Sequence, residues 1–177
     1  MTNTAQHAEL LPHYIGVDLT GARLLAGGFN GAFQLLGKAR VSAKPQRGPA
    51  SVLDRTARCV RDTVDECDLL PGQIRAVGLA VPGDLDPTSG HVAAAPVLGW
   101  KDLPLKQELE QRLQLPVFPA NDCQLAALAM CRQELDSAPE RFVAVFPDRP
   151  CFAAMLTRGQ LASPSPAIGD GQGVAAN

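Results

Sequence analysis

The stretch VFPANDCQLAALAMCRQEL, residues 117–135, decides the fold, because a strand and a helix meet within it. The apolar run Val117–Phe118 ends at Pro119, and an Ala- and Leu-rich run with high helix propensity begins at Cys123. Asn121 and Asp122 therefore lie between a predicted strand and a predicted helix, a common position for binding residues in α/β sheets. Two interpretations stay open at this point. The pair caps the helix, or Asp122 projects into a cleft as a carboxylate base.

The bulk composition is that of a globular protein with one core. The chain has 177 residues, 46% of them hydrophobic and 19% charged, with a net charge of −2. A net charge this close to zero gives the surface no overall positive potential that would attract nucleic acid or an anionic membrane. No apolar run approaches the ~20 residues that span a bilayer. Residues 1–10 lack the basic start and apolar block of a signal peptide. We therefore expect a cytoplasmic protein without nucleic-acid or membrane partners.

The cysteines show neither a Cys-x-x-Cys pair nor the Cys/His spacing of a zinc site. We expect reduced, mostly buried thiols and no bound metal. The five cysteines are Cys59, Cys67, Cys123, Cys131 and Cys151.

The first half of the chain predicts an antiparallel meander followed by alternating helices and strands. Apolar residues with steps of four and three predict a helix at Ser51–Cys67. The expected strands are His13–Asp18, Arg23–Phe29, Ala32–Val41 and the almost entirely apolar Ile74–Val81.

Residues 84–116 are expected to contain turns, one short β segment and one helix. Asp84–Gly90 is a cluster of turn residues, His91–Ala94 is a short β segment, and Pro96–Trp100 is a loop. Asp102 is expected to cap a helix that has Pro104 in its first turn.

The resulting order, β-β-β-α-β-α-β-α, indicates an α/β fold with an antiparallel flank. It is the pattern of a ribonuclease-H-like or actin-like lobe, with a mixed five-stranded sheet flanked by helices. A second group of short strands begins after Pro139, with strands expected at Arg141–Phe146 and Cys151–Thr157. So few strands form no independent core, and their apolar face needs cover, which predicts self-association. That face contains Val143, Val145, Phe152 and Met155.

Three segments of the chain together resemble the ROK family, which groups bacterial sugar kinases of the glucokinase type with sugar-responsive repressors. They are IGVDLTGARLLAG (15–27), AVGLAVPGDLDPTSGHV (76–92) and APVLGWKDLPLKQELEQRLQLPVFPANDCQLAAL (95–128). The resemblance implies two actin-like lobes with sugar and ATP in the cleft between them. Residues 1–136 would supply the first lobe, and residues 137–177 the truncated start of the second lobe with a flexible tail.

The resemblance also implies roles for individual residues. Asp122 takes the place of the catalytic base, and Asn121 that of a ligand to a sugar hydroxyl. Gly83 corresponds to a position where the backbone approaches the sugar. Asp18 and Gly21 belong to a phosphate-binding loop. Phosphoryl transfer needs such a carboxylate to orient the attacking hydroxyl, together with groups that hold phosphate.

The sequence departs from the family in both kinds of loop. The family's Asp-x-Gly-Gly-Thr is here Asp18–Ala22, so one glycine and the threonine hydroxyl are missing. A second, glycine-rich loop corresponds to Asp148–Ala154, where Pro150 has no N–H to offer an anion. Val97 replaces an asparagine of the sugar loop. Asp170 is a distant stand-in for the glutamate of the family's Glu-x-Gly-His.

The matches to the family and the departures from it are compatible with three functions. The first is a catalytically impaired ROK-like protein that keeps the lobe for sensing a small sugar or for assembly. The second is an active sugar kinase for a hexose or N-acetylhexosamine, completed by another subunit, with MgATP as cofactor only in this case. The third is an interaction domain or gene remnant without a ligand. Only 12 residues precede His13, so we expect no helix-turn-helix and no direct DNA binding.

Overall fold

The computed structural model describes residues 12–135, 137, 139–146 and 152–161. Contacts within the chain divide it into two compact units, residues 1–120 and residues 121–177. The predicted division after residue 136 stays a prediction. In the described part of the chain, no helix is both long and apolar enough to cross a membrane.

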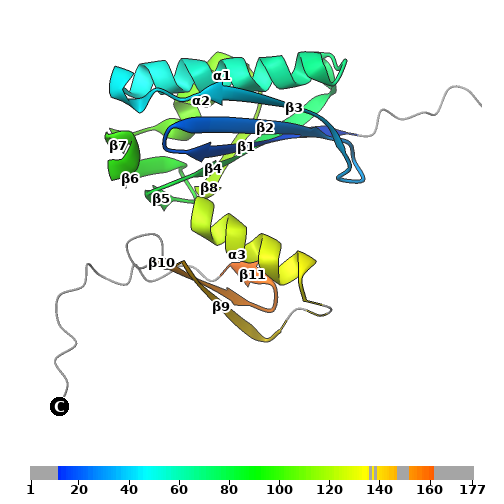
Figure 1. The fold of residues 1–177 in the computed structure, drawn as a ribbon, viewed down its shortest axis with the longest axis vertical. Helices are drawn as coiled ribbons and strands as arrows, with labels where there is room; N and C mark the ends of the chain where they lie inside the picture. The colour runs from blue at the N-terminus through cyan, green and yellow to red at the C-terminus, as the bar shows by residue number, and fades with distance from the viewer. Residues whose placement is uncertain (1–11, 136, 138, 147–151, 162–177) are drawn as a thin grey trace, which may run out of the picture. The chain divides into compact units, whose positions relative to one another are not determined.

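A mixed five-stranded sheet in the order β3-β2-β1-β4-β8 confirms the predicted fold class (Figure 1). The predicted meander is present, because β1 pairs antiparallel with β2 and β2 pairs antiparallel with β3. Strand β4 runs parallel to β1, as expected after a helical crossover. The strands are β1 (His13–Thr20), β2 (Arg23–Phe29), β3 (Leu35–Ser42), β4 (Ile74–Val81) and β8 (Val117–Asn121).

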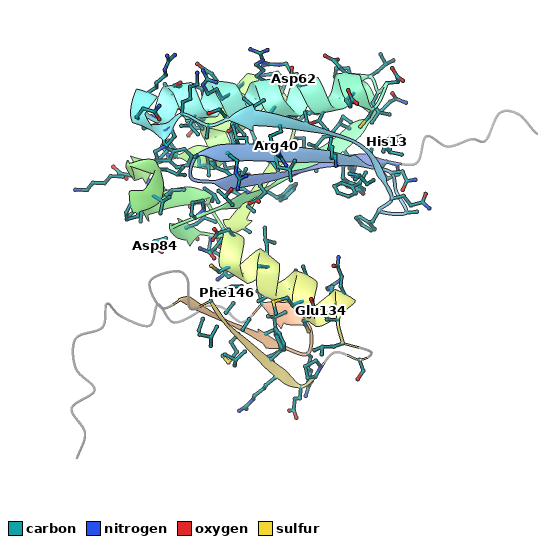
Figure 2. The ribbon with its side chains drawn as sticks, in the orientation of Figure 1. His13, Arg40, Asp62, Asp84, Glu134 and Phe146 are labelled. Atoms are coloured by element: carbon teal, nitrogen blue, oxygen red, sulfur yellow. The ribbon has the colours of Figure 1, made fainter. Side chains whose placement is uncertain are left out.

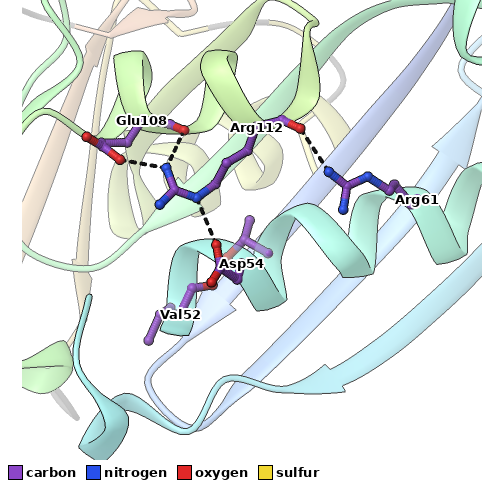
Figure 3. A network of polar contacts seen from close by, with 6 residues as sticks. Val52, Asp54, Arg61, Glu108 and Arg112 are labelled. Atoms are coloured by element: carbon purple, nitrogen blue, oxygen red, sulfur yellow. Dashed lines mark hydrogen bonds and ion pairs between the residues drawn. The ribbon is translucent and has the colours of Figure 1, made fainter. Parts of the chain in front are cut away.

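Two helices accompany the sheet in the first unit. Helix α1 (Pro49–Glu66) follows the short 3-10 helix η1 (Pro45–Arg47) and packs against β1, β2 and β3. Its predicted apolar stripe is buried, including Leu53 and Val60. Helix α2 (Leu105–Leu113) contacts α1, and polar side chains join the two helices (Figure 3).

Strand β3 begins later than predicted because a polar turn precedes it. The Asn30 side-chain oxygen accepts hydrogen bonds from the backbone N–H groups of Ala32 and Gln34, each at 3.0 Å. Phe33 has φ +59° in the same turn, a left-handed conformation that no strand contains. Residues 32–34, predicted as strand, therefore belong to the turn, and β3 starts at Leu35.

A second, three-stranded sheet corrects the prediction for residues 84–103. Its order is β5-β6-β7, formed by β5 (Asp84–Asp86), β6 (His91–Ala95) and β7 (Trp100–Leu103). Asp84–Asp86 was predicted as turn and Trp100 as loop. Both pair antiparallel with the neighbouring strand β6, and this pairing stabilises short strands whose residue types favour turns. Between β6 and β7 lies the 3-10 helix η3 (Pro96–Leu98).

Two local predictions around α2 and β8 are wrong. Asp102 does not cap α2: it lies in β7, and the N-cap residue is Pro104, which makes no side-chain capping bond. Strand β8 does not stop at Pro119 but continues to Asn121. Because β8 is the last strand in the sheet order, a proline without an N–H donor is tolerated there.

The second unit is a small sheet under one helix. Helix α3 (Asp122–Gln133) packs on β9 (Arg141–Phe146), β10 (Phe152–Thr157) and β11 (Gln160–Leu161), in the order β11-β10-β9. Helix α3 thus gives these strands the cover that they lack alone. The buried residues of this core are Ala127, Cys131, Ala144, Ala154 and Leu156.

The opposite face of this sheet keeps the apolar side chains that motivated the prediction of self-association. Val143 is 57% exposed and Val145 is 63% exposed. Met155 is half-buried and pairs with Val143, while the Phe152 side chain lies outside the described part. Self-association stays a prediction.

Candidate functional site

Two predicted site residues lie at one edge of the five-stranded sheet. Asp18 lies near the carboxyl end of β1 and is paired in register with Ala80 of the parallel strand β4. Strand β4 ends at Val81, and Gly83 follows two residues later. The Asp18–Gly21 segment and Gly83 therefore lie at the carboxyl ends of adjacent parallel strands, the usual place for ligands in such sheets. Asp18 is exposed there.

Gly83 has a structural requirement for glycine that is independent of any ligand. Its φ is +116°, a conformation that side-chain-bearing residues rarely adopt. A Cβ at this position would lie 2.4 Å from the carbonyl oxygen of Ala94 and 2.8 Å from the Cα of Ala95. The turn after β4 is thus packed against β6. The predicted approach of Gly83 to a sugar stays a prediction.

Gly21 in the predicted phosphate loop lies against Val97 of η3. Gly21 has φ +52°, and a Cβ there would be 3.0 Å from the Val97 Cγ1. Val97 is 66% exposed. Two of the departures from the family, in the phosphate loop and at Val97 of the sugar loop, are therefore in contact. Sequence spacing gave no signal of this contact, because the two residues are 76 positions apart and belong to separate elements.

Asn121 caps α3, so the capping interpretation is confirmed for this residue. Its side-chain oxygen accepts hydrogen bonds from the N–H groups of Cys123 at 2.9 Å and Gln124 at 3.1 Å. Asn121 is only 6% exposed. These bonds satisfy backbone donors that the first turn of a helix leaves unpaired.

Asp122 is the first residue of α3 and is half-buried. One of its carboxylate oxygens accepts a hydrogen bond from the N–H of Cys123 at 2.8 Å. The Cys123 N–H is thus shared between Asn121 and Asp122. Because both side chains accept a hydrogen bond from the same backbone N–H, the β8–α3 junction fixes the orientation of the Asn121 amide and of the Asp122 carboxylate.

A histidine–aspartate pair on the three-stranded sheet was not predicted. The Nε2 of His91 lies 2.9 Å from a carboxylate oxygen of Asp102, and Asp102 has φ +54°. Across the strand pair, His91 is in register with Asp86. The Ser89 hydroxyl, and after it the Thr88 N–H, donate to the Asp86 carboxylate and lower its pKa. The pair was missed because the sequence does not reveal that Asp102 adopts a positive φ.

The described cysteines form no disulfide. None of Cys59, Cys67, Cys123 and Cys131 belongs to a disulfide, and all but Cys67 are buried. Burial raises the pKa of Cys59 and of Cys67, which makes them poor nucleophiles. In the described ranges, no three His, Cys, Asp or Glu side chains form a group that could hold a metal ion.

Two of the predicted departures fall outside the described residues. They are the segment from Asp148 to Cys151 in the second glycine-rich loop, and Asp170.

The family model for the ROK family matches residues 14–150. The chain belongs to the ROK family. Among curated relatives, a glucokinase from Halalkalibacterium halodurans is 29% identical over 115 residues, which are 65% of this chain and 35% of that protein. A xylose repressor from Caldicellulosiruptor bescii is 33% identical over 69 residues, 39% of this chain and 17% of that protein. The matches therefore span about a third or less of these ROK proteins.

The structural comparison supports the same assignment. A crystal structure of a ROK family glucokinase from Streptomyces griseus, in complex with glucose and AMPPNP, superposes with a TM-score of 0.72 at 25% identity. The match covers 85% of this chain and 46% of that ROK glucokinase. The sheet described above is thus the fold of ROK sugar kinases, and the chain is similar to part of one.

Proposed function

We propose that this ROK chain binds a small sugar through Asn121 and Asp122 and that it does not transfer phosphate by itself. The observation that carries the proposal is the β8–α3 junction. The backbone N–H groups at the start of α3 fix the Asn121 oxygen and one Asp122 oxygen. A polar pair held in this way is preorganised, so little side-chain entropy is lost when a hydroxyl binds.

The chemistry of the pair suits a polyol ligand. An amide nitrogen donates and a carboxylate accepts, so together they match a sugar hydroxyl, which can do both. Asp122 would orient the hydroxyl that attacks phosphate in a kinase and accept its proton. The glucokinase from Streptomyces griseus was crystallised with glucose, which supports a sugar rather than another small molecule. Gly83 keeps its predicted role as a close backbone approach to the sugar.

Impaired phosphoryl transfer is supported by the β1–β2 turn. Ala22 has no hydroxyl where the family has a threonine, and a Val97 methyl lies against Gly21. An apolar methyl beside the turn offers no hydrogen bond to a phosphate oxygen. Asp18 and Gly21 would still contact phosphate, although with fewer donors than the family loop provides.

A second candidate is an active sugar kinase completed by another chain, with MgATP as its cofactor. The observation in favour is that several relatives are kinases, among them an N-acetyl-D-glucosamine kinase from Salmonella arizonae that is 31% identical over 116 residues. In this case Asp122 acts as the base and the partner supplies the rest of the nucleotide site.

Calorimetric titration with glucose, N-acetylglucosamine and N-acetylmannosamine tests the binding proposal. Asn121→Ser keeps a good helix cap but removes the amide, so we expect stability within about 0.5 kcal/mol of the parent and sugar affinity reduced about tenfold. Asp122→Asn should reduce the affinity similarly. Glu134→Gln, at the other end of α3, is the matched control and should change neither quantity.

A coupled assay with MgATP separates the two candidates. Sugar-dependent ATP turnover that disappears in Asp122→Asn would show an active kinase and refute the impairment. If none of the three sugars binds and none raises the melting temperature, the sugar proposal is wrong and an interaction domain without a ligand is favoured.

A further inference from the structure

Strand β3 forms an open edge of the five-stranded sheet. It stands first in the sheet order, and β2 is its only strand partner in the described part of the chain. From Gly37 to Ser42 its register with β2 is continuous. With eight residues and no proline, β3 is as long as the interior strands β1 and β4. Its outer edge therefore presents backbone N–H and C=O groups with which another extended chain can pair.

Positive charge is concentrated around this edge strand. Residues 19–53 contain five of the 16 lysine and arginine residues and none of the 18 acidic residues. The whole chain has a net charge of −2, so the residues outside this segment together carry a net charge of −7. The segment around β3 is thus opposite in charge to the rest of the chain. Its five cations are Arg23, Lys38, Arg40, Lys44 and Arg47.

Two of these cations, Lys38 and Arg40, point away from α1. A Cβ on Gly37 would lie 2.9 Å from the sulfur of Cys67, and Ala39 packs against the buried core. Because side chains alternate between the two faces of a strand, Lys38 and Arg40 lie on the other face. Both are exposed.

The charges of Lys38 and Arg40 are not neutralised within the described part of the chain, where neither residue forms an ion pair. Asp62 lies on the side of α1 that points away from the sheet (Figure 2) and is 3.5 Å from Arg58. Asp18 of β1 is separated from Arg40 by Leu25 of β2. The edge therefore keeps an excess of positive charge.

The amino end of β3 adds exposed apolar surface to the same face. Leu35 is 55% exposed, and Phe33 in the preceding turn is 74% exposed. The Phe33 ring stacks on Tyr14, with 5.9 Å between the ring centroids. The Cδ1 of Leu35 would be 3.0 Å from a Cβ on Gly27, the residue paired with Lys38. Along this face, β3 thus changes from apolar to basic.

Charge decides which kind of strand fits this edge. In an antiparallel pair of two β3 strands, Lys38 and Arg40 would face the same cations of the second copy, and like charges opposite each other destabilise strand pairing. An extended segment with an acidic residue at every second position would instead place carboxylates beside both cations. Charges on edge strands also discourage aggregation. Either sign serves that purpose, so it does not explain an edge opposite in charge to the rest of the chain.

We propose that β3 binds an extended acidic segment of another protein by strand addition. The segment's carboxylates face Lys38 and Arg40, and an apolar side chain at one end lies against Leu35 and Phe33. In such complexes the main-chain hydrogen bonds supply affinity, and alternate side chains supply specificity. The inference goes beyond the proposed function, because it requires neither Asp122 nor a sugar.

Fluorescence anisotropy with a labelled peptide of about ten residues, the length of a long strand, tests the proposal. The peptide alternates glutamate with threonine and has phenylalanine at both ends. We expect it to bind the parent chain, and to bind Lys38→Gln combined with Arg40→Gln about tenfold more weakly or worse. Lys38→Glu combined with Arg40→Glu should lose the glutamate peptide and bind a matched lysine peptide instead. Both cations are exposed, so the variants should keep the parent's melting temperature.

Two controls separate strand addition from general charge attraction. Methylation of alternate backbone nitrogens removes N–H donors from the glutamate peptide without changing its charge, and should weaken its binding about tenfold or more. Arg75→Gln removes an exposed cation near the start of β4 and should leave the affinity unchanged.

The proposal is overturned if the glutamate peptide does not bind the parent, if the methylated peptide binds as tightly, or if Arg75→Gln weakens binding as much as the double glutamine variant. Duplex DNA or anionic vesicles that displace the peptide and bind more tightly would also overturn it. A chain that binds sugar without the peptide contradicts this inference alone, and the reverse result contradicts the proposed function alone.

Discussion

The Arg112 guanidinium lies 3.0 Å from the Asp54 carboxylate and joins α2 to α1 across 58 residues of sequence (Figure 3). The same guanidinium donates to the Glu108 carboxylate at 2.5 Å and to the Glu108 carbonyl oxygen at 2.8 Å. The backbone oxygen of Arg112 in turn accepts from Arg61 of α1 at 2.8 Å. Glu108 first, and then Asp54, raise the pKa of Arg112 further above its ordinary value.

Removing this side chain should destabilise the first unit. Arg112→Ala is expected to lower the free energy of unfolding by about 1–2 kcal/mol, because one planar group makes three hydrogen bonds while only 25% exposed. Arg112→Lys should recover less than half of this loss, since an ammonium cannot bond both carboxylates in the same geometry. Urea unfolding measures both values, and a loss in Arg112→Lys as small as in Arg75→Ala would refute the role of the fork.

The tight packing of Gly83 against β6 predicts a severe effect of a single methyl group. Gly83→Ala should cost about 3 kcal/mol or more, because the Cβ meets backbone atoms that cannot rotate away and the φ angle is unfavourable. Gly72→Ala is the control, since nothing lies within 4 Å of a Cβ there, and it should change stability by less than about 0.5 kcal/mol. Thermal unfolding of the two variants without any sugar makes the comparison, and equal melting temperatures would contradict the packing.

Gly28 and Cys67 are expected to be energetically coupled. A Cβ on Gly28 would lie 2.5 Å from the Cys67 sulfur, and one on Gly37 would lie 2.9 Å from it. Gly28→Ala should therefore cost about 1–3 kcal/mol, whereas Gly28→Ala combined with Cys67→Ala should recover at least about 1 kcal/mol of that loss. A double-mutant cycle by urea unfolding measures the coupling, and strict additivity of the two substitutions would disprove it.

Asp86 predicts a specific pH dependence. Hydrogen bonds from Ser89 and Thr88 lower its pKa in the folded state. A lowered folded pKa stabilises the fold fully above the unfolded pKa of about 3.9, and this contribution is lost as the pH falls through the lower folded value. In Ser89→Ala, the pKa of Asp86 should rise toward its ordinary value, as followed by carboxyl NMR signals in a pH titration. Ser51→Ala is the control, and an unchanged Asp86 titration in Ser89→Ala would exclude the hydroxyl as the main cause.

The exposed valines of β9 predict self-association of the second unit. Val143 and Val145 present apolar surface on the face opposite α3, and such surface is usually covered. We expect the parent chain to sediment as an oligomer at micromolar concentration, and the variant with Val143→Thr and Val145→Thr to sediment as a monomer. Threonine keeps the β-propensity of valine, so the strand should persist. A monomeric parent chain would end this prediction.

The errors of the sequence-based prediction have a common physical cause. The third strand was placed three residues early because the Asn30 side chain organises a turn that composition does not reveal. Asp102 was assigned to a helix cap because aspartate favours caps, yet its carboxylate bonds His91 of a neighbouring strand. Pro119 was taken as the end of β8, although a terminal strand of the sheet tolerates proline. In each case the hydrogen bonding or the place in the sheet of a particular residue, and not its residue type, decided the local structure.

The amino-acid sequence by itself determined the order of the three α-helices and of the strands in the five-stranded sheet, the buried stripe of α1 and the polar pair at the start of α3. These follow from periodicity, propensity and capping, which act within a few residues. Only the tertiary structure decided that Val97 lies against Gly21, that β6 requires glycine at position 83, and that Arg55 of α1 reaches back to the last residue of β3. Such juxtapositions depend on how the chain crosses over and packs, and no short-range rule in the sequence encodes the crossing.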